Sequence, residues 1–190
     1  MDRIITAIQQ SIEVKQRILG NVQIINTIED IVMLAVNGYK NGNKVIFAGN
    51  GGSAADAQHL AAELTGKFYF DRAPLDAEAL HVNTSYLTAV ANDYAYDEVY
   101  VRALRAKAKK GDMLIALSTS GNSSNIIKAI KYCNDNNIIT VGLTGATGGM
   151  MKDLCNHIIM VPSKDTPRIQ EAHILIGHII CELIEKKLFL

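Results

Sequence analysis

The stretch Met113-Leu-Ile-Ala-Leu-Ser-Thr-Ser-Gly-Asn-Ser-Ser-Asn-Ile-Ile-Lys-Ala-Ile130 decides the fold class of this chain. Its apolar run from Met113 to Leu117 is typical of a strand that is buried on both faces of a sheet. The run stops at a hydroxyl-rich turn, residues 118–123, and an amphipathic helix follows from Ser124 to Tyr132. The stretch therefore predicts a parallel strand whose carboxyl end leads through a polar turn into a helix.

The hydroxyl-rich turn has the features of an anion-binding site. It offers free backbone N–H groups, several hydroxyl donors and the positive end of a helix dipole. It contains no lysine, so it is not the nucleotide P-loop, which needs Gly-Lys followed by Ser or Thr. We expect it to bind a small phosphate ester rather than a triphosphate.

The same order of strand, turn and helix recurs along the chain. Apolar runs predict strands at 44–48, 77–82, 113–117, 138–143 and 157–161. Strands that alternate with helices imply right-handed crossovers and a parallel sheet with helices on both faces. Two one-sided helices, at about 2–41, precede this α/β core of about 44–190. We therefore predict one α/β domain over residues 1–190, a length that suits a single core.

Composition excludes several classes of protein. The 190 residues include 19 basic and 19 acidic ones, without the basic stripe of a nucleic-acid binder. No apolar stretch approaches the roughly 20 residues that span a membrane, and the first residues lack a signal-peptide core. Cys133, Cys155 and Cys181 have no metal-type spacing and are odd in number. Unpaired thiols in a reducing cytoplasm are the expectation.

Two further segments carry residues suited to chemistry. Gly49-Asn-Gly-Gly-Ser53 forms a second strand-end turn, whose glycines permit close backbone approach to a ligand. In the helix that follows, His59 and Glu63 are four residues apart and share one face. Such a pair either binds a divalent metal, acts in acid–base catalysis or is simply hydrogen-bonded within the packing.

The last helix, at about 167–187, contains polar residues among many apolar ones. His173 and His178 are about 140° apart around the helix axis and cannot share a face. Gln170 and His178 are about 80° and roughly 12 Å apart, so they meet at one metal only by leaning together. For His173 and for His178, the default expectation is a histidine that is hydrogen-bonded within the core. His81 and His157 fall in predicted strands, and Asn92-Asp93 follows a predicted helix end.

Taken together, these segments resemble the phosphoheptose isomerase family of the SIS (sugar isomerase) superfamily over nearly the whole chain. The resemblance rests on Gly49-Asn-Gly-Gly-Ser53, His59, Glu63, Ala91-Asn-Asp93, Ser118-Thr-Ser-Gly-Asn-Ser123, Arg168-Ile-Gln-Glu171 and His178. It implies a three-layer sandwich with a five-stranded parallel sheet in flavodoxin-like order. It also implies conversion of D-sedoheptulose 7-phosphate to D-glycero-D-manno-heptose 7-phosphate through an enediol, the first step towards an activated heptose.

The resemblance assigns roles to residues by position. The phosphate would contact Ser118, Thr119, Ser120 and Ser123. The rest of the substrate would contact Asn50, Gly51, Gly52, Ser53, Glu63, Asn92, Asp93 and Gln170. A zinc ion would be held by His59, Glu63, Gln170 and His178, with Glu63 and His178 as the acid–base pair. The family forms homotetramers whose active sites draw on adjacent subunits, which would ease the distance between Gln170 and His178.

One departure and two alternatives accompany the resemblance. Some members have an acidic residue before the Arg-Ile-Gln-Glu motif, where this chain has Pro167, which suits the first turn of a helix. One alternative is a non-catalytic SIS protein that binds a replication initiator. Such proteins keep the Ser-rich turn but lack counterparts of Glu63 and His178. The other is a SIS isomerase of a different sugar phosphate.

Overall fold

Five parallel strands form one sheet at the centre of the molecule. The structure, a computed structural model, describes all residues from Met1 to Leu190. The strand order is β2-β1-β3-β4-β5, which is the flavodoxin-like order. The strands are β1 (Val45–Gly49), β2 (Ala77–Ala79), β3 (Met113–Leu117), β4 (Ile139–Thr144) and β5 (His157–Met160). The predicted parallel sheet and its order are confirmed.

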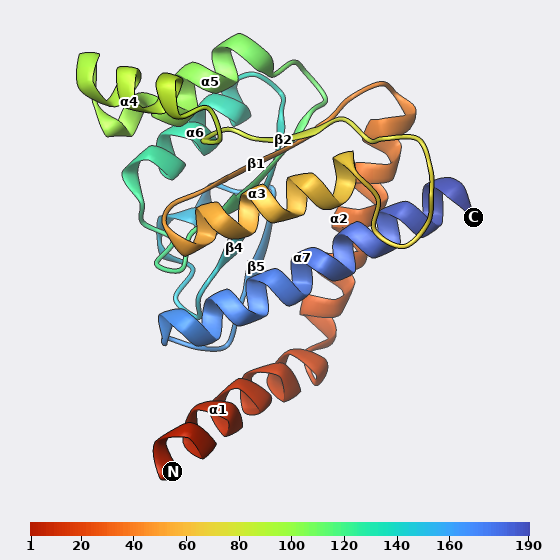
Figure 1. Cartoon of the computed structure of the whole chain (residues 1–190), viewed down its shortest axis with the longest axis vertical. Helices are drawn as coiled ribbons and strands as arrows, with labels where there is room; N and C mark the ends of the chain where they lie inside the picture. Colours follow the sequence, from red (N-terminus) through yellow and green to blue (C-terminus); the bar gives the residue numbers. More distant parts are fainter.

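Helices cover both faces of the sheet (Figure 1). Alternate strand residues point to opposite faces, so Val45 and Phe47 join one core while Ile46 and Ala48 join the other. The first core is shared with α2 (Val22–Lys40), α3 (Gly52–Thr65) and α7 (Thr166–Phe189). The second is shared with α4 (Thr84–Asp93), α5 (Val99–Lys107) and α6 (Ser124–Asp135). The three-layer sandwich is therefore confirmed.

Helix α1 (Asp2–Leu19) extends away from the sandwich and is attached along α7 (Figure 1). The chain then turns, and the side chain of Asn21 caps α2 by accepting the Ile24 N–H at 3.2 Å. No single helix is both long and apolar enough to cross a membrane. Only α1 and α2 taken together have that length and composition, and they are bent by 75° at their junction.

Three local predictions are wrong. Strand β2 ends at Ala79, so His81 lies in a turn, because the chain bends there towards the Asn83 cap of α4. Asn92-Asp93 forms the last turn of α4 instead of following it. The helix predicted at 97–108 begins as the short 3-10 helix η1 (Tyr96–Glu98) and continues as α5. His157 does begin strand β5, as predicted.

Candidate active site at the carboxyl ends of the strands

Two polar turns meet where the strand order reverses. Strands β1 and β3 are neighbours and end side by side, with Gly49 paired to Leu117. The chain leaves β1 towards β2 at one edge of the sheet and leaves β3 towards β4 on the other side. Ligands of open parallel sheets bind in the crevice at such a switch point. Residues 50–53 and 118–123 border this crevice.

The turn after β3 combines hydroxyl groups with a glycine in the left-handed region. Ser118 is buried, Thr119 and Ser123 are half-buried and Ser120 is exposed. The hydroxyl oxygens of Ser118 and Ser123 are 3.0 Å apart. Gly121 has φ +68° and donates its N–H to the Ser118 carbonyl, which closes a tight turn that a residue with a side chain rarely adopts.

This closed turn leaves several donors without an acceptor in the chain. Ser123 is the N-cap of α6, but its side chain makes no capping bond and pairs with Ser118 instead. The N–H groups of Thr119, Ser120 and Ser123 have no acceptor within the chain. Free amides, hydroxyls and a helix amino terminus together are the donor set of an anion site.

The turn after β1 presents mainly backbone. Gly51 has φ +56° and ψ −123°, a conformation that is accessible essentially to glycine alone. The N–H groups of Asn50, Gly51 and Gly52 find no acceptor within the chain. Ser53 is buried in the first turn of α3. This turn therefore adds a second set of backbone donors to the crevice.

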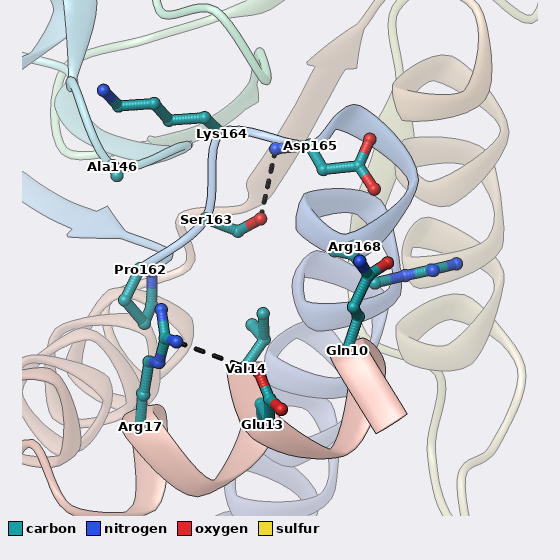
Figure 2. A pocket seen from close by; sticks show the side chains of 10 residues that line it. All are labelled: Gln10, Glu13, Val14, Arg17, Ala146, Pro162, Ser163, Lys164, Asp165 and Arg168. Atoms are coloured by element: carbon teal, nitrogen blue, oxygen red, sulfur yellow. Dashed lines mark hydrogen bonds and ion pairs between the residues drawn. The ribbon is translucent and has the colours of Figure 1, made fainter. Parts of the chain in front are cut away.

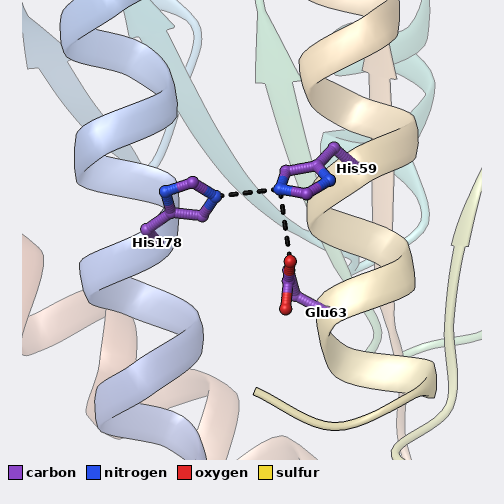
Figure 3. Close-up of side chains that lie close together, drawn as sticks. All are labelled: His59, Glu63 and His178. Atoms are coloured by element: carbon purple, nitrogen blue, oxygen red, sulfur yellow. Dashed lines mark hydrogen bonds and ion pairs between the residues drawn. The ribbon is translucent and has the colours of Figure 1, made fainter. Parts of the chain in front are cut away.

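His59, Glu63 and His178 lie together between α3 and α7 (Figure 3). The Nε2 atoms of the two histidines are 3.0 Å apart, and His59 Nε2 is 3.2 Å from Glu63 Oε1. One ligand atom from each residue lies within 4.8 Å of the others. Tetrahedral zinc with bonds of about 2.0–2.1 Å separates its ligand atoms by about 3.3 Å. The group therefore has the donors and spacing to hold one metal ion.

Gln170 of α7 contacts the first turn of α3. Its amide packs over Gly52, where an added Cβ would be 2.6 Å from Gln170 Nε2. Gly52 precedes His59 by seven residues, or about 10 Å along α3. Gln170 thus faces the amino terminus of α3 and the crevice. Its role as a metal ligand stays a prediction.

A buried ion pair supports the helix that carries His59 and Glu63. Arg72 is paired with Glu185 of α7 at 2.9 Å, and both side chains are almost inaccessible. The Arg72 guanidinium also donates to the carbonyls of Glu63, Leu64 and Gly66. A cation that binds the last carbonyls of a helix satisfies its unpaired acceptors. Arg72 therefore caps α3 while it is held by α7.

The same carboxylate orders the loop next to His178. Glu185 accepts the N–H groups of Phe68, Tyr69 and Phe70 at 2.7 to 3.3 Å. Burial raises the pKa of Glu185, but these three donors and Arg72 outweigh it and hold the pKa below its usual value. The ordered loop places the Phe68 ring against the His178 ring, with centroids 5.9 Å apart.

Two other polar residues near the site are perturbed by burial. His173 is fully buried, its Nε2 is 3.3 Å from the Thr144 carbonyl and its Nδ1 has no partner. Burial lowers the pKa of His173 to about 4, although the bond to Thr144 opposes this shift. Burial also raises the pKa of Asp56, and the nearby His59 counteracts it. His173 thus has the structural role expected of a core histidine.

Asn92 and Asp93 lie on the segment that leads into the crevice. Both are exposed, and the Asn92 amide donates to Asp93 at 2.9 Å. A few residues later, the Tyr96 hydroxyl is 3.1 Å from Asn50 Oδ1. The segment therefore borders the turn after β1, on the side of η1.

The largest cavity lies away from these groups. It has a volume of about 610 Å³ and opens between α1 and the segment that joins β5 to α7 (Figure 2). A smaller cavity of about 310 Å³ is lined by Thr119, Ser120 and Asn122 beside Lys164. We identify the site by its donor chemistry, because the largest cavity contains neither the hydroxyl turn nor the His–Glu–His group.

Sequence reasoning missed several residues that shape the site. They are Phe68, Arg72, Tyr96, Asn125 and Glu185. Asn125 carried a usable signal, because it is an amide on the apolar side of the helix that follows the hydroxyl turn. Arg72 and Glu185 carried none, because they are 113 residues apart and neither belongs to a motif.

The comparisons with known proteins agree with this geometry. The family described as SIS domain matches residues 10–145, so the fold and the site define a protein of the SIS class. The chain is 56% identical to the phosphoheptose isomerase of Aneurinibacillus thermoaerophilus over 99% of its length and 95% of that protein. It is 53% identical to phosphoheptose isomerase 2 of Campylobacter jejuni over 94% and 89% of the two chains. The chain belongs to the phosphoheptose isomerase family.

Solved structures support the same assignment. The phosphoheptose isomerase of Neisseria gonorrhoeae superposes with a TM-score of 0.91 at 38% identity, covering 97% of this chain and 98% of that one. The enzyme of Francisella tularensis superposes with a TM-score of 0.93 at 32% identity, covering 97% of each chain. The similarity therefore extends over the whole fold, including both turns and both helices of the site.

Proposed function

We propose that the protein is a sugar-phosphate isomerase that converts D-sedoheptulose 7-phosphate to D-glycero-D-manno-heptose 7-phosphate. The observation that carries this proposal is the group of His59, Glu63 and His178, assembled beside two donor-rich turns. Proteins that share more than half of the residues of this chain are phosphoheptose isomerases. Non-catalytic SIS proteins have a turn similar to residues 118–123, but they lack counterparts of Glu63 and His178.

The two turns account for binding of the substrate. Ser118, Thr119, Ser120 and Ser123 receive the phosphate through hydroxyls and free N–H groups. The backbone of residues 50–52 receives sugar oxygens, with Ser53, Asn92, Asp93 and Gln170 around them. A phosphate ester at the amino terminus of α6 gains from the helix dipole as well as from hydrogen bonds.

The acid–base pair accounts for the chemistry. The reaction removes a proton from the carbon beside the carbonyl, forms an enediol and returns a proton to the neighbouring carbon. Glu63 acts as the base at carbon and His178 manages the proton on oxygen in the simplest assignment. A carboxylate and an imidazole suit this division, because histidine exchanges protons near neutral pH.

The donor set of His59, Glu63 and His178 fits zinc, which prefers imidazole nitrogen and carboxylate oxygen. Gln170 completes the set if the site forms between subunits. Zinc held by these residues would supply a Lewis acid for the carbonyl oxygen of the substrate. His59 and Glu63 hold their positions on one face of α3, and Phe68 restrains the ring of His178.

We further propose a homotetramer whose active sites lie at subunit interfaces. Helix α1 exposes a row of isoleucines, with Ile4 67% and Ile8 56% accessible. Apolar rows of this kind mark contact surfaces, and a partner helix here would also cover the cavity beside α1. Light scattering should give four times the chain mass of 20.7 kDa. Ile8→Lys should lower that mass, and a monomeric wild-type protein would exclude the assembly.

The product and the free cysteines favour a cytoplasmic enzyme. A heptose 7-phosphate is suited to later phosphorylation and activation, and the enzyme would act in the cytoplasm, where its three free thiols stay reduced.

Steady-state turnover of D-sedoheptulose 7-phosphate tests the proposed function. Wild-type protein should form the heptose phosphate, while fructose 6-phosphate and arabinose 5-phosphate should react far more slowly. A dominant reaction with another ketose phosphate would replace the proposed substrate. Binding to a replication initiator without any turnover would replace the enzyme with a binding protein.

Elemental analysis tests the metal separately. Purified protein should contain zinc, and a chelator should remove both the metal and the activity. His59→Gln should lower the metal content, whereas His157→Gln, a matched change at the start of β5, should not. A fully active preparation without metal would remove zinc from the proposal.

A further inference from the structure

Asn50 and Asn125 form a reciprocal pair across the crevice. Each side-chain amide donates its Nδ2 hydrogen to the Oδ1 atom of the other, and both distances are 2.9 Å. The two residues are 75 positions apart: Asn50 belongs to the turn after β1, and Asn125 is the second residue of α6, directly after the hydroxyl turn. Asn125 is 2% exposed and Asn50 is half-buried, so this pair is a partly buried link between the turn after β1 and the start of α6.

The pair leaves Asn50 no free side-chain acceptor. Its Oδ1 accepts from Asn125 and also lies 3.1 Å from the Tyr96 hydroxyl, so both of its lone-pair directions are used. Asn125 Oδ1 is filled in the same way, by Asn50 and by the Ile126 N–H at 2.9 Å. What Asn50 can still offer a ligand are donors: its backbone N–H, which has no acceptor in the chain, and the second Nδ2 hydrogen.

A third segment completes the link. The Tyr100 hydroxyl donates to the Gly49 carbonyl, and the Ser124 hydroxyl donates to Asp97. Helices η1 and α5 therefore contact the turn after β1 and the start of α6 at the same time. The two donor-rich turns are held at one separation by side chains that belong to neither donor set.

We propose that Asn125 is a positioning residue for the isomerase, which sets the distance between the phosphate turn and the turn after β1. This inference rests on the proposed function, in which the phosphate is bound at 118–123 and the reacting carbons lie near Glu63. Glu63 belongs to the helix that starts at the turn after β1, so the separation of the turns places the reacting carbons relative to the base. A misplacement of about 1 Å costs on the order of a hundredfold in rate.

The first test compares substrate turnover with binding of inorganic phosphate. Asn125→Leu has nearly the same shape, adds no charge beside the phosphate turn and removes both hydrogen bonds of the amide pair. We expect kcat/KM for sedoheptulose 7-phosphate to fall about ten- to a hundredfold, mostly through kcat. The dissociation constant of inorganic phosphate should change less than about threefold, because phosphate contacts one turn only. Equal losses in both measurements would mean general damage and would overturn the proposal.

A double-mutant cycle tests whether Asn50 acts through the pair. Asn50→Ala and Asn125→Ala should each lower kcat/KM, and the double variant should resemble Asn125→Ala within about threefold. If the two losses multiply, the Asn50 side chain binds the sugar by itself and the proposal is wrong. Tyr96→Phe, which keeps the amide pair, should give a smaller loss. Asn136→Ala, at the other end of α6, is the matched control and should match wild type.

Hydrogen exchange separates this inference from the proposed function. In Asn125→Ala, the amides of Ser53, Ala54 and Ala55, which donate to the carbonyls of Asn50 and Gly51, should exchange faster than in wild type, while those of the sheet stay protected. This measurement needs no substrate, so it stands even if the wild-type protein does not isomerise sedoheptulose 7-phosphate. Unchanged exchange at these three amides would overturn the positioning role.

Discussion

The hydroxyl turn after β3 and the His–Glu–His group between α3 and α7 are built in different ways. The turn is one continuous segment, 118–123, and its donors are placed by local backbone geometry at the end of a buried strand. The group joins His59 to His178 across 119 positions, so it exists only when two helices pack in one register. Recognition of an anion is therefore a local property here, whereas the chemistry depends on tertiary packing.

Specific contacts hold the two helices in that register. Leu60 lies against Gly177, where an added Cβ would come within 2.4 Å of a Leu60 methyl carbon. Arg72 caps α3 and is paired with Glu185 of α7. If the comparison is right, changes at these contacts disturb the His–Glu–His group and spare the anion site.

The largest effect is expected from the acid–base pair itself. Glu63→Gln and His178→Gln should each lower kcat about 10²- to 10⁴-fold, the usual contribution of a general acid or base. Affinity for inorganic phosphate should stay within about threefold of wild type, because the turn is untouched. Glu182→Gln on the exposed side of α7 serves as the control. Full turnover of sedoheptulose 7-phosphate by either variant would refute the assignment.

Removal of Arg72 should give the next largest effect. Arg72→Met leaves the Glu185 carboxylate buried without its cation, and such a loss costs about 3–5 kcal/mol. Urea unfolding measures the change, and metal content should fall with it. Lys186→Met breaks an exposed pair with Glu182 and should cost less than about 1 kcal/mol. A similar loss of unfolding free energy in the two variants would show that the buried Arg72–Glu185 pair stabilises the fold no more than an exposed pair does.

Acid should destabilise the folded protein because His173 of α7 binds a proton more readily in the unfolded state. The pKa of this residue is about 4 in the folded protein against 6.5 for the free side chain, so the unfolded state binds more protons between these values. Stability therefore falls as the pH drops from 7 to 5, by about 2 kcal/mol for this residue. His173→Phe should remove that part of the dependence in urea unfolding at the two pH values. An unchanged dependence in the variant would contradict the assignment.

The smallest effect is expected within the anion turn. Ser120→Ala removes one of the several hydroxyls proposed to bind the phosphate, and at this exposed position its hydrogen bond should contribute about 1.5 kcal/mol, the lower end of the range for bonds to charged groups. The KM for sedoheptulose 7-phosphate should rise about tenfold or somewhat more, with kcat nearly unchanged. Asn134→Ala, at the far end of α6, provides the comparison. A fall in kcat with unchanged KM would place Ser120 in the chemistry.

Much of the fold was predictable because its signals are local. The apolar runs at 44–48 and 113–117 are each followed by a polar turn and a helix. Near-continuous apolar runs of this length are typical of strands that are buried on both faces of a sheet. The wrong predictions concern segments whose structure depends on the elements packed against them. Strand β2 at the sheet edge is three residues long, because its pairing with β1 ends when the chain bends towards α4.

The candidate site divides in the same way. The proximity of His59 and Glu63 followed from helical spacing, and the structure adds His178 to them. Gln170 illustrates the limit, because its amide packs over Gly52, a neighbour that its position in the helix does not predict. A helix period gives the angle of a side chain, but it does not say which neighbouring helix lies opposite.

The sequence by itself determined the class of the protein and the kind of ligand. Strand–turn–helix order and the Ser-Thr-Ser-Gly-Asn-Ser motif consist of consecutive residues, and local backbone geometry is enough to build from them the donor-rich turn that we propose as the anion site. The tertiary structure alone decided the contacts of His178, the Arg72–Glu185 pair and the Asn50–Asn125 link. These contacts join residues far apart in the chain, and their geometry depends on how buried surfaces pack rather than on local conformational preference.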